Sequence, residues 1–472
     1  MRPRGALLVA LVVALGCQPR TTPPPVSARP SPASGTGYNV VLITIDTLRA
    51  DHLGMYGYRR ATSPRLDAFA TRSAVFDAAY TYWPKTRASM IMMLTGRRPS
   101  QNGYSKTHAV LLDFNATLAS VLKAAGYSTT AYVDNANVAS ELGYAKGFDT
   151  YMEAWQRPEL KSEMDRTFAI TEGGLATIRN APPGKPYFLW LHYVNPHAPY
   201  TPPAPYDTTF LDESSRAGGD LRVVKGYKGG IHAELAVSGQ RKLGYYVAQY
   251  DGEIAAVDEQ VGRVLEAIVD NDRLARTVVV VTSDHGESLG EHDYYFDHGE
   301  NLFDPSLRIP MLLAAPGVKP QRSAAFASTL DVLPTLLDAA KVSYPPDLAG
   351  RSLLPGVSGG KAQARERLFA QNDYNLRATF DASYKLVATP VGDKDQWGLY
   401  DRARDPGEAR NVRPQRTDEF REQRRELDLY FELMDKEWVA TRKLVEGKPG
   451  EPKLTGPACE QLRALGYVAN CG

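Results

Sequence analysis

The feature that most constrains the fold is a recurring alternation of apolar, β-favouring runs with amphipathic helical stretches. Residues 39–45 form a largely apolar run that ends at Asp46, as expected for a strand buried on both faces of a parallel sheet. Further β-rich runs occur at 127–133, 187–193 and 277–282, and helical spacing occurs at 117–125 and 247–269. This alternation predicts an α/β fold with a large, mostly parallel sheet flanked by helices.

Composition limits the class of protein. The 472 residues are 43% hydrophobic and 23% charged, as in ordinary globular proteins, which excludes disordered, collagenous and multi-span membrane chains. The formal net charge is only +1, and neither a basic stripe nor a nucleic-acid motif occurs. We therefore expect no nucleic-acid partner, and an anionic substrate has to be recognised locally.

The N-terminus is predicted to be a processing segment. Arg2 and Arg4 precede a short apolar run, and Ala14-Leu15-Gly16-Cys17 resembles a bacterial lipobox. Residues 1–17 are therefore predicted to be a signal peptide with a lipidated Cys17, and the Pro-, Ser- and Thr-rich residues 18–37 a tether. This predicts a protein lipid-anchored to the membrane of a bacterial cell envelope, facing the periplasm or the exterior. The alternative is an ordinary signal peptide and a secreted protein.

The texture of the sequence changes after Gly350. Residues 38–350 are predicted to be the catalytic domain and residues 351–472 a smaller C-terminal α+β subdomain with a tail. Short strands are expected at 368–372, 384–388 and 398–401, and a charged helix at 418–437. Cys459 and Cys471 are predicted either to form a disulfide, which an oxidising compartment would permit, or to remain free thiols.

Polar residues gather where the predicted strands end. Asp46 follows the first run, His192 lies near the end of another, and Asp284 and His285 follow 277–282. The carboxyl ends of parallel strands share one sheet edge, where ligands collect in open α/β sheets. Alone, Asp46 could be a structural acid; together, these residues suggest a site for one divalent metal ion. Carboxylate and imidazole ligands favour Mn or Zn over Ca.

A second chemical signal is the hydroxyl of Thr86, which opens the apolar helical stretch 86–97. The free amides of a helix N-terminus favour an anionic group and can activate a nucleophile. The simpler interpretation is that Thr86 is an N-cap residue.

Several longer motifs resemble the sulfatase family of the alkaline phosphatase superfamily. They follow the family order and cover nearly all of the chain from Tyr38 onward. The motifs are Ile43-Thr44-Ile45-Asp46-Thr47-Leu48-Arg49, Leu191-His192-Tyr193-Val194-Asn195-Pro196-His197, Thr282-Ser283-Asp284-His285-Gly286-Glu287, Phe296-Asp297-His298-Gly299, and the tail Leu462-Arg463-Ala464-Leu465-Gly466-Tyr467.

The resemblance implies an alkaline-phosphatase-like fold and an ester hydrolase. By position, it implies that Asp46, Asp284, His285 and the Thr86 oxygen bind the metal. It also implies that Thr86 is the nucleophile, with His197, His298 and His192 as catalytic residues facing the ester. Arg87 is either a replacement for a family arginine or a surface arginine on the first helical turn. Asp51, His52 and Asp251 are expected in the scaffold or in the shell of residues around the site.

The nucleophile segment departs from the family pattern. Sulfatases carry Cys or Ser there, in a Cys/Ser-x-Pro-x-Arg context, converted to formylglycine. This chain has Thr86, Ala88 and Met90 instead. Threonine does not form formylglycine by that route, but a threonine nucleophile occurs in relatives that move phosphoryl-linked groups.

We therefore predict a metal-dependent hydrolase of phosphate or sulfate esters, with Thr86 favouring phosphoester hydrolysis or phospho-group transfer. The expected substrate is a small anionic ester or a lipid- or glycan-linked one. The alternative is a non-catalytic, sulfatase-like binding lipoprotein. The sequence sets no oligomeric state.

Overall fold

The computed structural model describes residues 37–270, 273–361, 364–448, 450–468 and 470–471. The predicted signal peptide, Cys17 and nearly all of the predicted tether lie outside these residues. Within the described ranges, no helix combines the length and the apolar character needed to cross a membrane.

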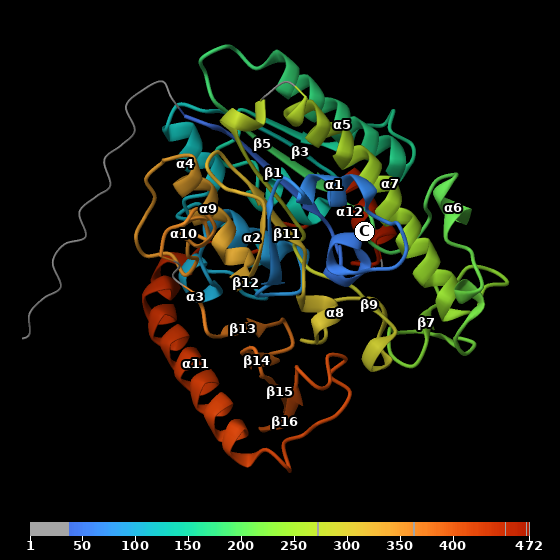
Figure 1. The fold of residues 1–472 in the computed structure, drawn as a ribbon. Helices are drawn as coiled ribbons and strands as arrows, with labels where there is room; N and C mark the ends of the chain where they lie inside the picture. The colour runs from blue at the N-terminus through green and yellow to red at the C-terminus, as the bar shows by residue number, and fades with distance from the viewer. Residues whose placement is uncertain (1–36, 271–272, 362–363, 449, 469, 472) are drawn as a thin grey trace, which may run out of the picture.

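The centre of the molecule is an eight-stranded sheet with the strand order β12-β2-β11-β8-β1-β5-β3-β4 (Figure 1). All neighbours pair in parallel except β11, which runs antiparallel to both β8 and β2. The mostly parallel sheet predicted from the sequence is therefore confirmed. Its strands are β1 (Asn39–Ile45), β2 (Ala74–Tyr80), β3 (Ser128–Val133), β4 (Thr150–Glu153), β5 (Tyr187–Tyr193), β8 (Thr277–Thr282), β11 (Met311–Ala314) and β12 (Gln321–Ser328).

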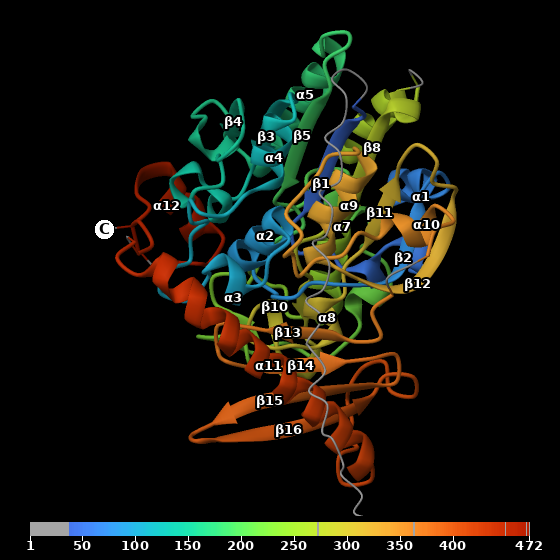
Figure 2. The same ribbon diagram turned by 90° about the vertical axis from the view of Figure 1, so that its left-hand side faces the viewer.

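Helices cover both faces of this sheet (Figure 2). Alternate residues of β1 enter two separate cores: Val40 and Leu42 pack into one, and Val41 and Ile43 into the other. The first core includes α2 (Thr86–Thr95), α4 (Leu118–Ala124) and α9 (Val332–Ala339), and the second includes α1 (Pro64–Ala70), α5 (Glu163–Asn180) and α7 (Leu243–Val269). A strand covered on both faces has no polar alternation, which explains the continuous apolar runs.

The C-terminal part carries a separate four-stranded antiparallel meander, below the main sheet in Figure 2. Its strands are β13 (Leu368–Gln371), β14 (Arg377–Phe380), β15 (Tyr384–Val391) and β16 (Lys394–Asp401). The long helix α11 (Thr417–Val445) packs on β14 and β15, which confirms the smaller α+β unit. Figure 1 shows α11 along one side of the molecule and α12 (Gly456–Ala464) near the main sheet.

Cys459 and Cys471 form a disulfide, so the paired alternative is the one observed. It joins α12 to the chain beyond it.

The remaining helices and strands are short. They are α3 (Pro99–Asn102), α6 (Tyr206–Thr209), α8 (Asp304–Leu307), α10 (Leu354–Val357), β6 (Val223–Val224), β7 (Ile231–His232), β9 (Ser288–Leu289) and β10 (Tyr295–Asp297).

Candidate active site

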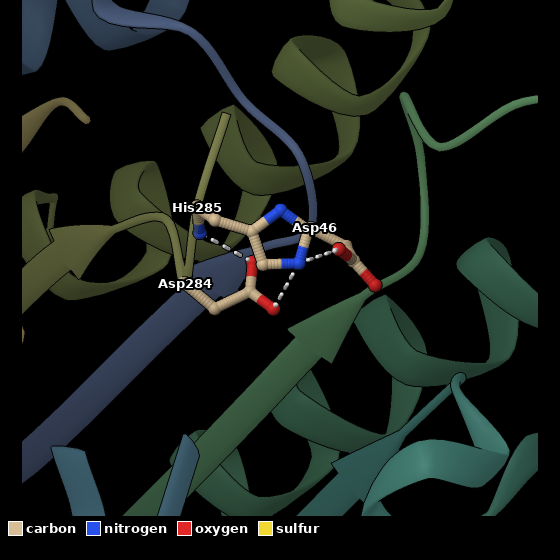
Figure 3. A group of neighbouring side chains, drawn as sticks. All are labelled: Asp46, Asp284 and His285. Carbon is tan, nitrogen blue, oxygen red and sulfur yellow. Dashed lines mark hydrogen bonds and ion pairs between the residues drawn. The ribbon is translucent and has the colours of Figure 1, made fainter. Parts of the chain in front are cut away.

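Three neighbouring strands deliver the polar residues to one edge of the sheet. β1 lies between β5 and β8, and Thr44 of β1 is in register with both His192 and Thr282. Asp46 directly follows β1, while Asp284 and His285 follow β8. Because the three strands are parallel and in register, these side chains converge, and all are buried (Figure 3).

Asp46, Asp284 and His285 form a compact cluster. One ligand atom from each lies within 4.8 Å of the others. His285 Nε2 lies 3.3 Å from Asp284 Oδ2 and 3.7 Å from Asp46 Oδ1, as the dashed lines in Figure 3 mark.

The hydrogen bond of His285 Nδ1 determines which ring nitrogen faces the two carboxylates. Its Nδ1 lies 2.9 Å from the Gly286 carbonyl oxygen, which can only accept, so Nδ1 carries the hydrogen. In the neutral ring, Nε2 then directs a lone pair at the two carboxylates. Lone pairs facing one another in a buried site require a cation or a proton between them.

Three buried polar atoms without a hydrogen-bond partner also favour a cation at this site. Asp46 Oδ1, Asp284 Oδ2 and His192 Nε2 are buried and have no hydrogen-bond partner. Burial and the nearby Asp284 carboxylate raise the pKa of Asp46 well above its usual range, despite the bond donated by Asn135 Nδ2 to Asp46 Oδ2 at 2.5 Å. The donor set, two carboxylates and an imidazole, fits a divalent metal of the Mn or Zn type.

His192 lies at the edge of this cluster. Its Nδ1 is 2.8 Å from Thr44 Oγ1, and its Nε2 is 3.9 Å from Asp46 Oδ2. Burial lowers the pKa of His192 to about 4, so the ring is neutral and can offer a lone pair. His192 therefore lies beside Asp46 with a neutral ring.

Thr86 lies against the cluster at the start of α2. The cap position belongs to Lys85, and the end of the helix carries no side-chain cap hydrogen bond. The N-cap interpretation of Thr86 is therefore wrong: its Oγ1 lies 3.3 Å from His285 Nε2 and 3.2 Å from the hydroxyl of Tyr467. The rest of α2 from Ala88 onward is buried, which fixes this end of the helix against the sheet edge.

His197 and His298 both face the same point in front of Thr86. Their Nε2 atoms lie 2.9 Å and 3.1 Å, respectively, from the Tyr467 hydroxyl. His298 Nδ1 lies 3.0 Å from Glu287 Oε1, a buried carboxyl that orients the ring. Burial lowers the pKa of His197 to about 4 and that of His298 well below its ordinary range, so both rings are neutral without a ligand.

A cavity of about 250 Å³ opens beside Thr86. Its lining includes Lys85, Arg87 and Lys106 together with Asp373 and Glu451, which pair with Lys85 and Arg87, and Tyr467 and Val468 contribute from the C-terminal segment. Arg87 Nε donates to Asn137 Oδ1 at 2.8 Å, and its guanidinium pairs with Glu451. Arg87 thus lines the cavity beside Thr86.

Three residues that contact the site were not predicted from the sequence: Asn135, Glu287 and Tyr467. Glu287 and Tyr467 each end a recognised motif, but nothing in those motifs indicates their contacts. The residues expected in the scaffold form another network: Asp251 accepts from Tyr58 and Arg60, each at 2.7 Å, and lies 2.7 Å from His52 Nδ1. Asp51 pairs with Arg49. These contacts tie the loop after β1 to α7.

Comparison with known proteins decides the family. The model of the family described as Sulfatase matches residues 38–342, and that of the N-sulphoglucosamine sulphohydrolase C-terminal region matches residues 290–432. The chain belongs to the sulfatase family. This assignment places it in the alkaline phosphatase superfamily and makes it an ester hydrolase, as the motifs imply.

Individual relatives agree along nearly the whole length. The chain is 26% identical to an arylsulfatase of Clostridium perfringens, over 87% of this chain and 98% of that protein. It is 23% identical to a delta 4,5-hexuronate-2-O-sulfatase of Bacteroides thetaiotaomicron, over 90% and 96% respectively. The structure of a phosphonate monoester hydrolase of Agrobacterium radiobacter has the same fold, with a TM-score of 0.69 and 20% identity over 85% of this chain and 96% of that one.

Proposed function

We propose that this sulfatase-family hydrolase uses Thr86 as its nucleophile, depends on a divalent metal, and acts on phosphate-type esters in preference to sulfate esters. The observation that carries the proposal is the position of Thr86 Oγ1, 3.3 Å from His285 Nε2 at the edge of a buried carboxylate and imidazole cluster. Such a cluster of titratable groups around a hydroxyl is typical of a catalytic site, and a hydroxyl with a purely structural role does not require it.

Asp46, Asp284 and His285 would hold the metal, with Thr86 Oγ1 completing the set and His192 Nε2 beside it. When bound, a divalent cation acts as a Lewis acid that lowers the pKa of a neighbouring hydroxyl and neutralises charge on the ester. The remaining chemistry falls to this chain's own side chains.

In the first half-reaction, Thr86 gives up its hydroxyl proton to bulk water, Oγ1 forms a bond to phosphorus, and the bond from phosphorus to the leaving oxygen breaks. His298 or His197 gives the leaving oxygen its proton. Both imidazoles are neutral in the free site, but an anionic ester beside them raises their pKa and favours the protonated form. In the second half, the same imidazole takes a proton from water, whose oxygen bonds to phosphorus as the bond from phosphorus to Thr86 Oγ1 breaks. Thr86 leaves as the alkoxide that begins the next turnover.

The positive end of α2, and the excess of cations over acids among the residues that line the cavity, favour an anionic head group. Some relatives are named as glycan sulfatases: one solved structure holds D-glucosamine-2-N,6-O-disulfate. We propose a small anionic ester or a glycan- or lipid-linked one as the substrate.

We also propose that the chain is anchored at the bacterial cell envelope through Cys17. The support is the lipobox-like Ala14-Leu15-Gly16-Cys17 followed by a Pro-rich stretch. Metabolic labelling with a lipid precursor tests this: label on the wild type but not on Cys17→Ala supports the anchor, and equal absence from both contradicts it.

The test of function is side-by-side hydrolysis of an aryl phosphate monoester, an aryl phosphate diester and an aryl sulfate by metal-loaded enzyme. Thr86→Ala is compared with the wild type, and Arg463→Ala, an exposed change on α12, is the control. We expect metal-dependent phosphate-ester cleavage that only Thr86→Ala loses. Faster sulfate than phosphate cleavage would overturn the substrate preference. Bound metal without turnover of any ester would favour the binding-protein alternative.

A further inference from the structure

The C-terminal segment enters the active site, and the end of α12 sets its direction. Gly466 has a φ of +80°, Gly466 N donates to Arg463 O at 3.0 Å, and Tyr467 N donates to Leu462 O at 2.8 Å. These two bonds form a Schellman motif, which needs glycine at the left-handed position. The chain therefore turns sharply at Gly466 and projects Tyr467 away from the helix axis.

Several contacts hold α12 in place. Gln461 Nε2 donates to Asp134 Oδ1 at 2.7 Å, and Gln461 Oε1 accepts from Ala136 N at 2.7 Å. Leu462 is buried in the core beside α2, and the disulfide between Cys459 and Cys471 ties the chain beyond Tyr467 back to the helix. Tyr467 thus belongs to an anchored unit.

The Tyr467 hydroxyl stands at the focus of the proposed chemistry. It lies 3.2 Å from Thr86 Oγ1, 2.9 Å from His197 Nε2 and 3.1 Å from His298 Nε2. These are the groups that the proposed mechanism directs at the ester. The Tyr467 hydroxyl oxygen contacts all three groups, so it occupies the position expected for an ester oxygen of the substrate.

Glu451, from the same C-terminal segment, adds a negative charge that resembles an anionic group of a substrate. Its carboxylate pairs with Arg87, and both residues line the 250 Å³ cavity beside Thr86. An anionic substrate would compete for that guanidinium. The segment therefore contributes a hydroxyl beside the nucleophile and a carboxylate on the neighbouring cation.

We infer that residues 451–468 bind the chain's own active site as a substrate mimic, and that Tyr467 is a specificity-determining residue. The inference rests on the proposed function. An ester reaches Thr86 only by displacing the phenol ring of Tyr467. The apparent affinity of every ligand is therefore its intrinsic affinity multiplied by the fraction of molecules in which Tyr467 has left the site. Esters with a second anionic group for Arg87 compete with both parts of the mimic, so the site selects them over simple aryl esters.

The test measures inorganic phosphate binding by calorimetry on the metal-loaded full chain. Tyr467→Ala removes the ring, Tyr467→Phe removes only the hydroxyl, and Arg463→Ala is the control on the same helix. We expect phosphate to bind about tenfold more tightly to Tyr467→Ala than to the wild type, a factor within the range of typical coupling energies. Phosphate should bind Arg463→Ala with the wild-type affinity. Tyr467→Phe should lie between them. Saturating phosphate should speed hydrogen exchange at the Gly466 and Tyr467 amides of the wild type.

Unchanged phosphate affinity in both Tyr467 variants, with unchanged amide protection in the wild type, overturns the inference. Slower ester hydrolysis by Tyr467→Phe at unchanged phosphate affinity also overturns it, because the hydroxyl then assists the reaction. If the affinities follow the expected order but no ester is hydrolysed, the proposed function fails and the mimic stands. If hydrolysis depends on Thr86 but the phosphate affinity is the same in the wild type and the Tyr467 variants, only the inference fails.

Discussion

Thr86 and His285 are 199 residues apart in sequence, yet their Oγ1 and Nε2 atoms lie 3.3 Å apart. The contact brings the start of α2 to the end of β8, where His285 holds its hydrogen on Nδ1 and its lone pair on Nε2. A hydroxyl on this lone pair and two carboxylates nearby form a donor set that a divalent cation would complete.

The hydroxyl of residue 86, and not its shape, should determine activity. Thr86→Ser keeps the hydroxyl, while Thr86→Val keeps the branched shape without it. We expect Thr86→Ser to retain activity within about tenfold and Thr86→Val to lose on the order of a thousandfold or more in kcat, as for other nucleophile losses. Initial rates on an aryl phosphate check this, and comparable rates for the two variants would contradict it.

Asp284→Asn should change stability in opposite directions with and without metal. Without metal it relieves repulsion with Asp46, whose pKa is raised by burial and by Asp284, so unfolding should need more denaturant. With Mn or Zn, the wild type should gain about 3 kcal/mol at a hundred times Kd, and the variant much less. Denaturant unfolding with and without chelator measures both effects.

Asp258→Asn, a buried carboxyl change on α7, is the matched control and should keep the full metal gain. Equal gains in Asp284→Asn and the wild type would exclude Asp284 from the metal site.

Lys385 should be a main stabilising residue of the C-terminal sheet. It is fully buried, lies 2.6 Å from Glu408 Oε1 and also pairs with Asp304, the first residue of α8. Lys385→Met leaves the buried Glu408 carboxylate without its cation, beside the half-buried Asp304, and should cost about 3–5 kcal/mol of unfolding free energy. The exposed Lys394→Met on the neighbouring strand is the control, with an expected change below about 0.5 kcal/mol. Similar losses for the two variants would contradict the prediction.

Asp258 should make stability fall as pH rises toward neutrality. Burial raises the pKa of Asp258 to about 7, although its oxygens accept from the Arg65 and Leu66 amides at 2.9 Å. Between about pH 4 and 7 the unfolded chain has lost this proton while the folded chain keeps it. Stability from this group therefore declines with rising pH, by on the order of 1 kcal/mol per unit. The difference in unfolding free energy between wild type and Asp258→Asn, measured from pH 4.5 to 7.5, should show that slope; parallel curves would contradict it.

The sequence predicts the buried centre of the fold best. β1, β5 and β8 begin and end where their apolar runs do, because both faces are covered and the pattern is continuous. β12 gives no such signal, since it is an edge strand whose first half is mostly exposed. α5 was missed because Gly173 and Gly174 interrupt its pattern; they admit the close approach of Tyr132 and Leu191, with which a Cβ would collide.

Long-range contacts explain the other differences. α11 extends to Val445 beyond the predicted 437, because Thr441 Oγ1 donates to Ser100 O at 2.6 Å and Val445 enters the core. The carboxylate and imidazole cluster was accessible from sequence because parallel strands end at one edge. Tyr467 was not: it is 381 residues from Thr86, and only the turn at Gly466 and the anchoring of α12 bring them together.

The central claim is that Thr86 carries the transferred group. The most direct measurement is an acid quench of metal-loaded enzyme during a single turnover of an activated aryl phosphate, followed by mass spectrometry of the peptide containing Thr86. We expect phosphate on Thr86 that forms and decays at rates consistent with turnover, and none in Thr86→Val. Hydrolysis by Thr86→Val at the wild-type rate would contradict it.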